Sequence, residues 1–247
     1  MTQPAWFCPQ CQAALVCTDD RHVCSDCGWV RRREGRIWLA REAPQPAGFD
    51  ADAVKRLQTL ESHFWMRGRR RLVERLLRRI AAPGRCAVEL GCGTGGLLTT
   101  LEHGFARVTA VDAHAVLLQK AALNSTRAEL FQADVTRTSL PGNENDLVIA
   151  LDVIEHVDPD ALLAEARRIT APNGVLLLSA PSAPSLWSRM DELAGHRCRY
   201  TRKQLTDELT RNGWEPQGFT HYQCLLFPLV WLSHAHIRCF MALAKVM

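Results

Sequence analysis

Val88-Glu-Leu-Gly-Cys-Gly-Thr-Gly95 is the most informative part of this sequence. A short apolar run that carries an acid leads into glycines at alternate positions, and a helical pattern follows. Glycine lets the backbone approach a ligand where a side chain would clash. The stretch therefore predicts a buried strand, a ligand-binding turn and a helix in succession. A glycine-rich turn alone also suits a dinucleotide, although the spacing here is Gly-x-Gly-x-Gly and not the longer dinucleotide form.

Two further acids sharpen this interpretation. Asp112 closes the apolar run Val108–Val111, 23 residues after Glu89, and Asp134 closes the run Leu130–Ala133. A carboxylate at the end of the second strand can accept hydrogen bonds from both hydroxyls of a ribose. The later acid is well placed to accept one from an adenine amino group. Three acids at the ends of three successive strands would line the crevice edge where such sheets bind ligands.

The pattern of alternating strands and helices continues along the chain. Each predicted strand is followed by a helical run, which is typical of an α/β fold with a parallel sheet covered on both faces. The later strands are expected at 146–151 and 175–179, with a closing pair at 214–219 and 222–227. Helices are expected at 97–102, 115–123, 161–170 and 202–211, the last with Thr201 as N-cap and Gly213 at its end.

These motifs together resemble the class I S-adenosylmethionine-dependent methyltransferases. Asp146-Leu-Val-Ile-Ala-Leu-Asp-Val-Ile-Glu-His-Val-Asp158 looks like the fourth-strand motif of the branch that contains the ubiquinone-biosynthesis O-methyltransferases. Pro172-Asn-Gly-Val-Leu-Leu-Leu-Ser-Ala-Pro181 resembles the fifth-strand motif. The resemblance implies a Rossmann-like seven-stranded methyltransferase sheet with helices on both faces.

The resemblance also implies a site for S-adenosylmethionine. Glu89 would lie near the methionine end, Asp112 on the ribose, and Asp134 at the adenine. One of Arg69, Arg70 and Arg71, in the helix before the sheet, would clamp the methionine carboxylate, although that helix also suits a solvated basic face or a nucleic-acid patch. The implied cofactor residues are Trp65, Arg69, Glu89, Gly91, Cys92, Gly93, Gly95, Asp112, Ala113, Asp134, Val135, Leu151 and Asp152.

The N-terminal segment predicts a metal site. Cys8, Cys11, Cys24 and Cys27 form C-x2-C-x12-C-x2-C, a spacing that suits tetrahedral zinc. Four thiolates indicate a closed structural site, because catalytic zinc keeps one position open. A unit of this size buries too little surface to fold alone, so the metal supplies the missing free energy, on the order of 10 kcal/mol. The segment resembles the zinc ribbons fused before some methyltransferases. The other six cysteines are expected to be small buried hydrophobes of a reducing compartment.

The expected organisation has five parts. A zinc ribbon (1–42) and a Pro-rich linker (43–49) precede lid helices (50–82), which Gly68 would divide in two. The methyltransferase domain (83–228) is followed by an apolar C-terminal helix (229–247). Such a helix must be buried against its own domain, a partner or second copy, or a membrane interface. In the second and third of these cases, residues 225–247 would contact a protein or a membrane interface.

The segment after the fifth strand carries the predicted catalytic residues. It resembles the cap of bacterial relatives that carry a Gly-His-Arg-Arg-Arg-Tyr-Thr pattern, with Cys198 in place of an arginine. His196 is the first candidate for a general base and His156 the second, because a neutral histidine can accept the proton of a hydroxyl or amine. Methyl transfer also proceeds without a base when nucleophile and methyl group are well aligned.

The function expected from these motifs is methyl transfer from S-adenosylmethionine to a hydroxyl or amine of a small or lipid-like molecule. One alternative is an RNA methyltransferase that binds through the ribbon and the seven arginines between Arg67 and Arg79. Few aromatic side chains stand among the basic residues, which disfavours nucleic acid as a partner. A non-catalytic binding or scaffold protein is the third hypothesis.

Composition adds limits to these hypotheses. Apolar residues make up 47% and charged residues 23% of 247, which is average for a globular protein and excludes a disordered or collagen-like chain. No apolar run reaches the ~18 residues of a spanning helix, and no secretory signal is visible. We therefore expect a cytoplasmic protein, at most peripheral to a membrane.

Overall fold

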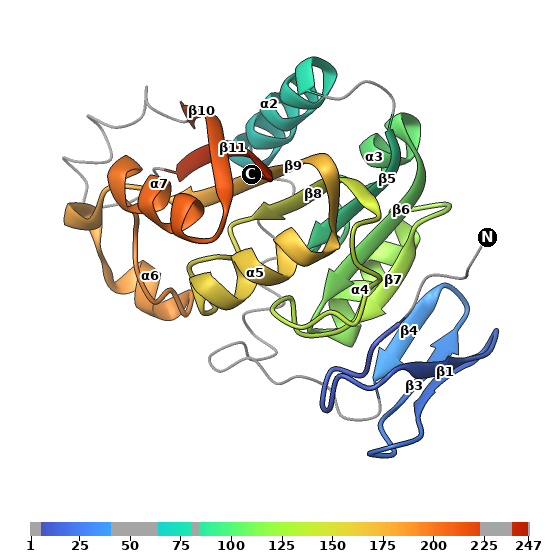
Figure 1. The fold of residues 1–247 in the computed structure, drawn as a ribbon. Coiled ribbons are helices and arrows are strands. Elements are labelled where there is room, and N and C mark those ends of the chain that lie inside the picture. The colour runs from blue at the N-terminus through green and yellow to red at the C-terminus, as the bar shows by residue number, and fades with distance from the viewer. Residues whose placement is uncertain (1–5, 41–63, 81–83, 223–238, 247) are drawn as a thin grey trace.

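A computed structural model describes residues 6–40, 64–80, 84–222 and 239–246. Within these ranges eleven strands form a single sheet in the order β1-β2-β3-β4-β7-β6-β5-β8-β9-β11-β10 (Figure 1). The strands are β1 (Leu15–Cys17), β2 (Arg21–Cys24), β3 (Val30–Glu34), β4 (Ile37–Ala40), β5 (Gly84–Leu90), β6 (Phe105–Asp112), β7 (Glu129–Gln132), β8 (Asn145–Leu151), β9 (Thr170–Pro181), β10 (Trp214–Tyr222) and β11 (Cys239–Val246). The helices are α2 (Phe64–Ile80), α3 (Leu98–Gly104), α4 (Ala115–Leu123), α5 (Pro159–Ile169), the 3-10 turn η1 (Pro184–Leu186), α6 (Arg189–Leu193) and α7 (Arg202–Arg211).

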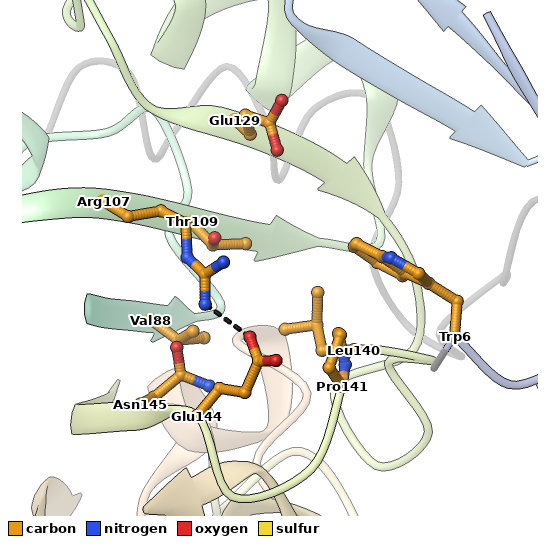
Figure 2. A pocket seen from close by; sticks show the side chains of 9 residues that line it. All are labelled: Trp6, Val88, Arg107, Thr109, Glu129, Leu140, Pro141, Glu144 and Asn145. Carbon is orange, nitrogen blue, oxygen red and sulfur yellow. Dashed lines mark hydrogen bonds and ion pairs between the residues drawn. The ribbon is translucent and has the colours of Figure 1, made fainter. Parts of the chain in front are cut away.

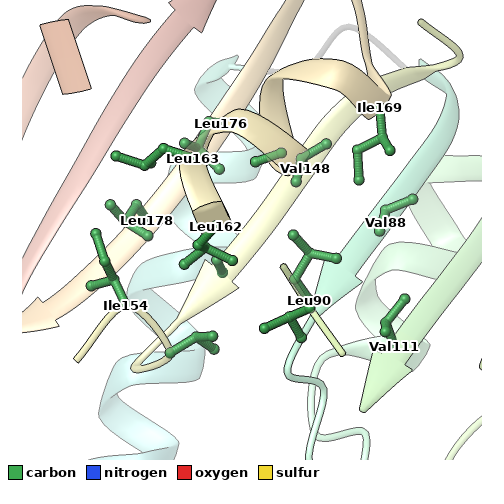
Figure 3. Packing of buried hydrophobic residues seen from close by; sticks show 14 of the residues in the cluster. Val88, Leu90, Val111, Val148, Ile154, Leu162, Leu163, Ile169, Leu176 and Leu178 are labelled. Atoms are coloured by element: carbon green, nitrogen blue, oxygen red, sulfur yellow. The ribbon is translucent and has the colours of Figure 1, made fainter. Parts of the chain in front are cut away.

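The central strands β7, β6, β5, β8 and β9 run parallel. Successive residues of each strand point to opposite faces, so Val88 and Leu90 join one core cluster while Ala87 joins the other. α5 and α7 cover the first face, where α5 packs on β8 and β9 (Figure 3). α2, α3 and α4 cover the second. The α/β class and the two covered faces are therefore confirmed.

Helix ends follow the local chemistry that the sequence offers. The Asp158 side chain accepts a hydrogen bond from the Ala161 N–H at 2.9 Å and caps α5. Thr201 forms a capping box with Gln204 at the start of α7, as predicted. Gly213, with φ +76°, follows the end of α7 in a conformation that favours glycine.

The prediction that Gly68 divides the lid helix is wrong within the described residues. α2 runs unbroken from Phe64 to Ile80. A Cβ added at Gly68 would meet nothing within 4 Å, so the residue stands in an open stretch of helix surface. A glycine there costs about 1 kcal/mol relative to alanine, which is too little to end a helix whose apolar face is packed. The linker 43–49 and the lid segment 50–63 lie outside the described residues.

The predicted C-terminal helix is also wrong where the structure describes it. Residues 239–246 form strand β11, which lies between β9 and β10 and pairs antiparallel with both. The antiparallel partner of β10 is thus β11. The predicted closing strand at 222–227 is wrong at its first residue, because Tyr222 is the last residue of β10. Residues 223–238 lie outside the described residues. A short apolar run suits a helix and a fully enclosed strand equally well. The segment forms a strand because β9 and β10 both offer it an edge with which to pair.

The N-terminal ribbon (residues 6–40) is part of the same sheet. β4 pairs in parallel with β7, with Ile37 opposite Leu130 and Trp38 opposite Phe131 (Figure 1). The guanidinium of Arg36 donates to Ala122 O and Ser125 O, both at 2.7 Å, and so holds the loop between α4 and β7. The ribbon is therefore fixed to β7, at the edge of the parallel strands.

A buried arginine, Arg31, lies where the ribbon packs against the parallel strands. Arg31 is 1% exposed, and its guanidinium lies 4.7 Å from the ring centre of Phe131 and between 5.1 and 5.8 Å from three tryptophans, Trp6, Trp29 and Trp38. Its terminal nitrogen lies 2.8 Å from His22 Nδ1. Burial lowers the pKa of Arg31 to about 9 and, with the arginine charge, that of His22 to about 4. A neutral His22 accepts this hydrogen bond, and the four rings stabilise the buried cation.

Among the described residues, no helix is both long enough and apolar enough to cross a membrane.

Candidate functional site

The four predicted metal ligands come together in the ribbon. The Sγ atoms of Cys8, Cys11, Cys24 and Cys27 lie within 4.8 Å of one another. Cys8 and Cys27 are 3.5 Å apart, and Cys11 and Cys24 are 3.4 Å apart. These separations exceed the S–S bond of about 2.05 Å and approach the edge of about 3.8 Å that four bonds of about 2.3 Å to one zinc ion would give. The four cysteine thiols thus fit a closed tetrahedral zinc site.

Two similar turns present these thiols. Each C-x-x-C pair is followed by a residue with positive φ, Gln12 at +65° after the first pair and Gly28 at +74° after the second. Hydrogen bonding from the backbone N–H of Cys27 is the largest cause that lowers the pKa of Cys24 to about 7, which favours its thiolate. Cys17 is exposed and outside the cluster, so the expectation that it is buried is wrong. It lies on β1, the outer strand of the sheet, where no layer covers it.

The glycine turn lies at the carboxyl end of β5. A Cβ at Gly91 would come within 2.5 Å of the Val153 side chain, and one at Gly95 within 2.9 Å of the Ala121 backbone. Both glycines therefore allow close packing behind the turn. A Cβ at Gly93 would meet nothing within 4 Å, so space remains in front of the turn.

The three predicted acids line one edge of the sheet, as expected. Asp112 accepts hydrogen bonds from the N–H groups of Gly93 and His114, both at 2.9 Å, which hold its carboxylate beside the turn. Asp134 is exposed, and its Oδ1 accepts from the N–H and hydroxyl of Thr136. Ala113, also predicted, accepts a hydrogen bond from the Gln132 amide at 3.1 Å.

Glu89 is the buried member of this set. It is 5% exposed, and burial raises its pKa to about 8 against the opposing effect of the nearby Arg69 charge. Its Oε2 is buried with no hydrogen-bond partner among the described residues. A buried acceptor of this kind suits an ammonium group, and the open space at the glycine turn suits a nucleoside. The residues present therefore fit S-adenosylmethionine.

α2 contributes one arginine to the same edge. Arg69 forms an ion pair with Asp152, whose Oδ1 also accepts from the Ser179 hydroxyl at 2.6 Å. Arg70 and Arg71 are exposed, so the structure selects Arg69 among the three candidates. Asp152 has φ +55°, so the chain turns directly after β8. The side chain of Trp65 lies outside the described residues.

The other predicted cofactor residues are mostly buried. Cys92 is 6% exposed, and burial raises its pKa well above the usual value, so it is not a thiolate nucleophile. Leu151 and Val135 pack in the two core clusters, one on each face of the sheet. Their side chains therefore belong to the hydrophobic core on which the predicted site is built.

The two predicted catalytic histidines are neighbours. The rings of His156 and His196 are 5.0 Å apart at 74°. The backbone N–H of Arg197 donates to Glu155 O at 2.7 Å, which holds the segment after α6 against the segment after β8. Burial, aided by the His196 charge, lowers the pKa of His156 to about 4.

Asp191 and Arg199, to which the sequence assigned no role, orient His196. The Asp191 carboxylate is 2.9 Å from His196 Nδ1 and receives two hydrogen bonds from Arg199, at 2.8 and 3.0 Å. Burial alone would raise the pKa of Asp191, but the bonds from Arg199 and His196 outweigh it and lower that pKa. An ionised carboxylate only accepts hydrogen bonds, so Nδ1 carries the proton and the other nitrogen, Nε2, is the basic one.

Glu155 is a further residue that the sequence did not single out. It is 1% exposed, and burial raises its pKa well above the usual value. Its carboxyl lies with the two histidines, since one ligand-type atom of each falls within 4.8 Å of the others, a set that could hold a metal ion. The only sequence signal for it is the Glu-His pair of the fourth-strand motif.

A separate cavity lies away from this edge (Figure 2). Glu129 and Asn145, the first residues of β7 and β8, place it toward the amino ends of the strands. It is bordered by Trp6 of the ribbon and by an ion pair of 2.5 Å between Arg107 and Glu144. None of the predicted site residues lines it.

Comparisons with known proteins agree with this geometry. The family described as a methyltransferase domain matches residues 88–178. A malonyl-[acyl-carrier protein] O-methyltransferase of Alcanivorax borkumensis is 33% identical over 133 residues, which are 49% of this chain and 45% of that protein. A ubiquinone biosynthesis O-methyltransferase of Xanthomonas campestris is 28% identical over 172 residues, 65% of each chain. The chain spans between 40% and 65% of the length of these and the other curated relatives that it matches.

Solved structures share the fold. The magnesium protoporphyrin IX methyltransferase of Synechocystis PCC 6803, determined with bound S-adenosylhomocysteine, aligns with a TM-score of 0.64 at 17% identity. The alignment covers 82% of this chain and 97% of that one. The fold is thus the Rossmann-like α/β fold of methyltransferases.

Proposed function

We propose that this chain is an S-adenosylmethionine-dependent methyltransferase. The observation that carries the proposal is the set of three acids, Glu89, Asp112 and Asp134, at the carboxyl edge of β5, β6 and β7 around an open glycine turn. The matching family and the named methyltransferase relatives support it. In this assignment Glu89 holds the ammonium group, Asp112 the ribose hydroxyls and Asp134 the adenine, and Arg69 exchanges its bond to Asp152 for the cofactor carboxylate.

When bound, S-adenosylmethionine supplies a methyl group on a positively charged sulfur. His196 would accept on Nε2 the proton of the acceptor hydroxyl or amine, while the acceptor oxygen or nitrogen bonds to that methyl carbon and the carbon–sulfur bond breaks, which would leave the sulfur as a neutral thioether. Asp191 keeps the proton on Nδ1 and stabilises the imidazolium that results. His156, buried and neutral, lies beside this base. The base is worth up to about 10⁴-fold in rate, and alignment of the two reactants supplies the rest.

The acceptor is proposed to be a small or lipid-like molecule with a hydroxyl or amine. Two relatives are O-methyltransferases by name, and one structural relative is a geranyl diphosphate methyltransferase. The four cysteines of the ribbon are proposed to hold structural zinc. RNA remains the acceptor to test against, because Arg67, Arg70 and Arg71 of α2 are exposed on one helix.

The experiment that tests the function uses methyl-labelled S-adenosylmethionine and an extract of host cells. Label in the lipid or small-molecule pool supports the proposal, whereas label in RNA identifies a nucleic-acid enzyme. The His196→Ala variant is the matched control for catalysis, and the Asp112→Ala variant for cofactor binding. Failure of the protein to bind S-adenosylmethionine at millimolar concentration would favour a scaffold protein instead. Glu155→Gln in the labelled reaction tests whether a metal at Glu155, His156 and His196 is required, because a chelator would also remove zinc from the ribbon.

A further inference from the structure

The loop that carries Asp134 is held by the metal-binding part of the ribbon. This loop (residues 134–140) leads from β7 toward β8 and forms no helix. Its first turn is made by Asp134, whose carbonyl accepts from the Arg137 N–H at 3.0 Å and whose Oδ1 accepts from the Thr136 N–H at 2.8 Å. The position of the Asp134 carboxylate therefore depends on where Thr136 and Arg137 lie.

Two side chains fix that turn. The Arg137 guanidinium donates to the carbonyl of Pro9 at 2.9 Å, and Pro9 lies between Cys8 and Cys11 in the first thiol turn. Glu165 of α5 accepts from the N–H and hydroxyl of Thr138 at 2.8 and 2.5 Å. One of the two anchors thus belongs to the catalytic domain and the other to the ribbon.

The ribbon also packs beneath the same loop. The ring of Trp6 lies 5.3 Å from that of Phe131, and the core cluster that these rings join includes Val135. A small cavity beside the Arg137–Pro9 hydrogen bond is lined by residues of both parts, among them Phe7 and Ser139. The first thiol turn is therefore in contact with the loop that begins at the predicted adenine end of the cofactor site.

We infer that the ribbon contributes to cofactor binding, because its metal-bound Cys8–Cys11 turn positions Asp134 through the Pro9 carbonyl and Arg137. Arg137 is a positioning residue here, since it acts on the cofactor through Asp134. A metal held by the four cysteines fixes the Pro9 carbonyl, whereas four free thiols would leave the turn to move. The inference rests on the proposed function, because it takes Asp134 to bind the adenine.

The test is a double-mutant cycle read by calorimetry with S-adenosylhomocysteine, which binds without reacting. In zinc-loaded protein, Arg137→Ala should weaken binding about threefold to tenfold, the range of one hydrogen bond. Asp134→Ala should weaken it at least as much, and the double variant should bind like Asp134→Ala alone, since groups in one network are not additive. Removal of zinc by a chelator should weaken the wild type and add nothing to the loss in Arg137→Ala. Arg211→Ala, which removes an exposed arginine at the end of α7 that is bonded to Asp160, is the matched control and should not alter binding.

Different results separate the inference from the function on which it rests. Unchanged binding in Arg137→Ala, or losses that multiply in the double variant, would overturn the inference while wild-type binding still supports the function. A zinc-loaded wild type that binds no S-adenosylhomocysteine would overturn both. Thermal unfolding of each variant shows whether it is folded. Arg137 is exposed at the surface, so its variant keeps the test valid even if the chelated protein unfolds.

Discussion

Glu102 offers the sharpest test of the forces that hold the loop before β7. It lies in the last turn of α3 with 9% exposure, and its carboxylate organises this loop at the amino end of the strand. Partial burial opposes its ionisation, but hydrogen bonds from the Ser125 hydroxyl and from the N–H groups of Arg127, Ala128 and Thr126 lower its pKa from 4.5 to about 2. The ionised form is thus preferred in the folded chain.

The expected change in stability follows from this shift. Because the pKa is lower in the folded state, Glu102 stabilises the fold at any pH above about 4.5, and this stabilisation is lost as the pH falls from about 4.5 to about 2. At roughly 1.4 kcal/mol for each step of one in pKa, the change from 4.5 to about 2 amounts to about 3.5 kcal/mol at most. Glu102→Gln removes the charge while it keeps the shape, so it should destabilise the protein by about 2–3 kcal/mol at pH 7.

The assay is denaturant unfolding of wild type and variant at pH 7, 4.5 and 3. The free-energy difference between the two proteins should shrink as the pH falls, and this difference also cancels any loss of metal common to both. Glu34→Gln removes an exposed carboxyl of β3 and is the control. A difference below about 0.5 kcal/mol at pH 7, or one that stays constant down to pH 3, would refute the argument.

The remaining predictions concern the site and the ribbon. Asp112→Ala should lose about 2–3 kcal/mol of affinity for S-adenosylmethionine, because a charged hydrogen-bonding partner is removed; equal binding by calorimetry would contradict the ribose assignment. His196→Ala should lower turnover of the labelled acceptor while cofactor affinity stays intact, and an unaffected rate would exclude it as the base. Arg31→Ala should destabilise the metal-loaded protein by about 2–4 kcal/mol, since it leaves a cavity among four rings; unfolding at the wild-type denaturant concentration would show that the cation contributes nothing. Cys24→Ser should abolish zinc binding, measured by release to a chromophoric chelator, and retention of zinc would place the metal elsewhere.

Much of the fold could be predicted from local patterns. The strands β5 to β9 and the helices α4 and α7 lie where apolar period and capping residues put them. A capping box or a glycine with positive φ acts within a few residues, so the sequence shows both partners at once. The acids at the ends of β5, β6 and β7 could be found for the same reason, because a parallel sheet brings successive strand ends to one edge.

Contacts between distant residues could not be predicted in this way. Arg69 meets Asp152 across 83 positions, and Arg137 meets Pro9 across 128. The sequence offered three arginines for the lid and no reason to choose among them. His196 was found as a candidate, but its orientation depends on the Asp191–Arg199 pair, which forms only when α6 and the following loop fold back together.

The α/β class, the acids at one edge of the sheet and the four-cysteine group could be predicted from the sequence, because each follows from spacing along the chain. Whether residues 239–246 form a strand or a helix could not, since their apolar pattern suits both, and it depends on the open edges of β9 and β10 that supply the partners. Only the tertiary structure shows that the ribbon joins the sheet, because the pairing of β4 with β7 connects segments about ninety positions apart. Local sequence preference determines which helices and strands form. The pairing of open strand edges and the burial of apolar side chains determine which of them become neighbours.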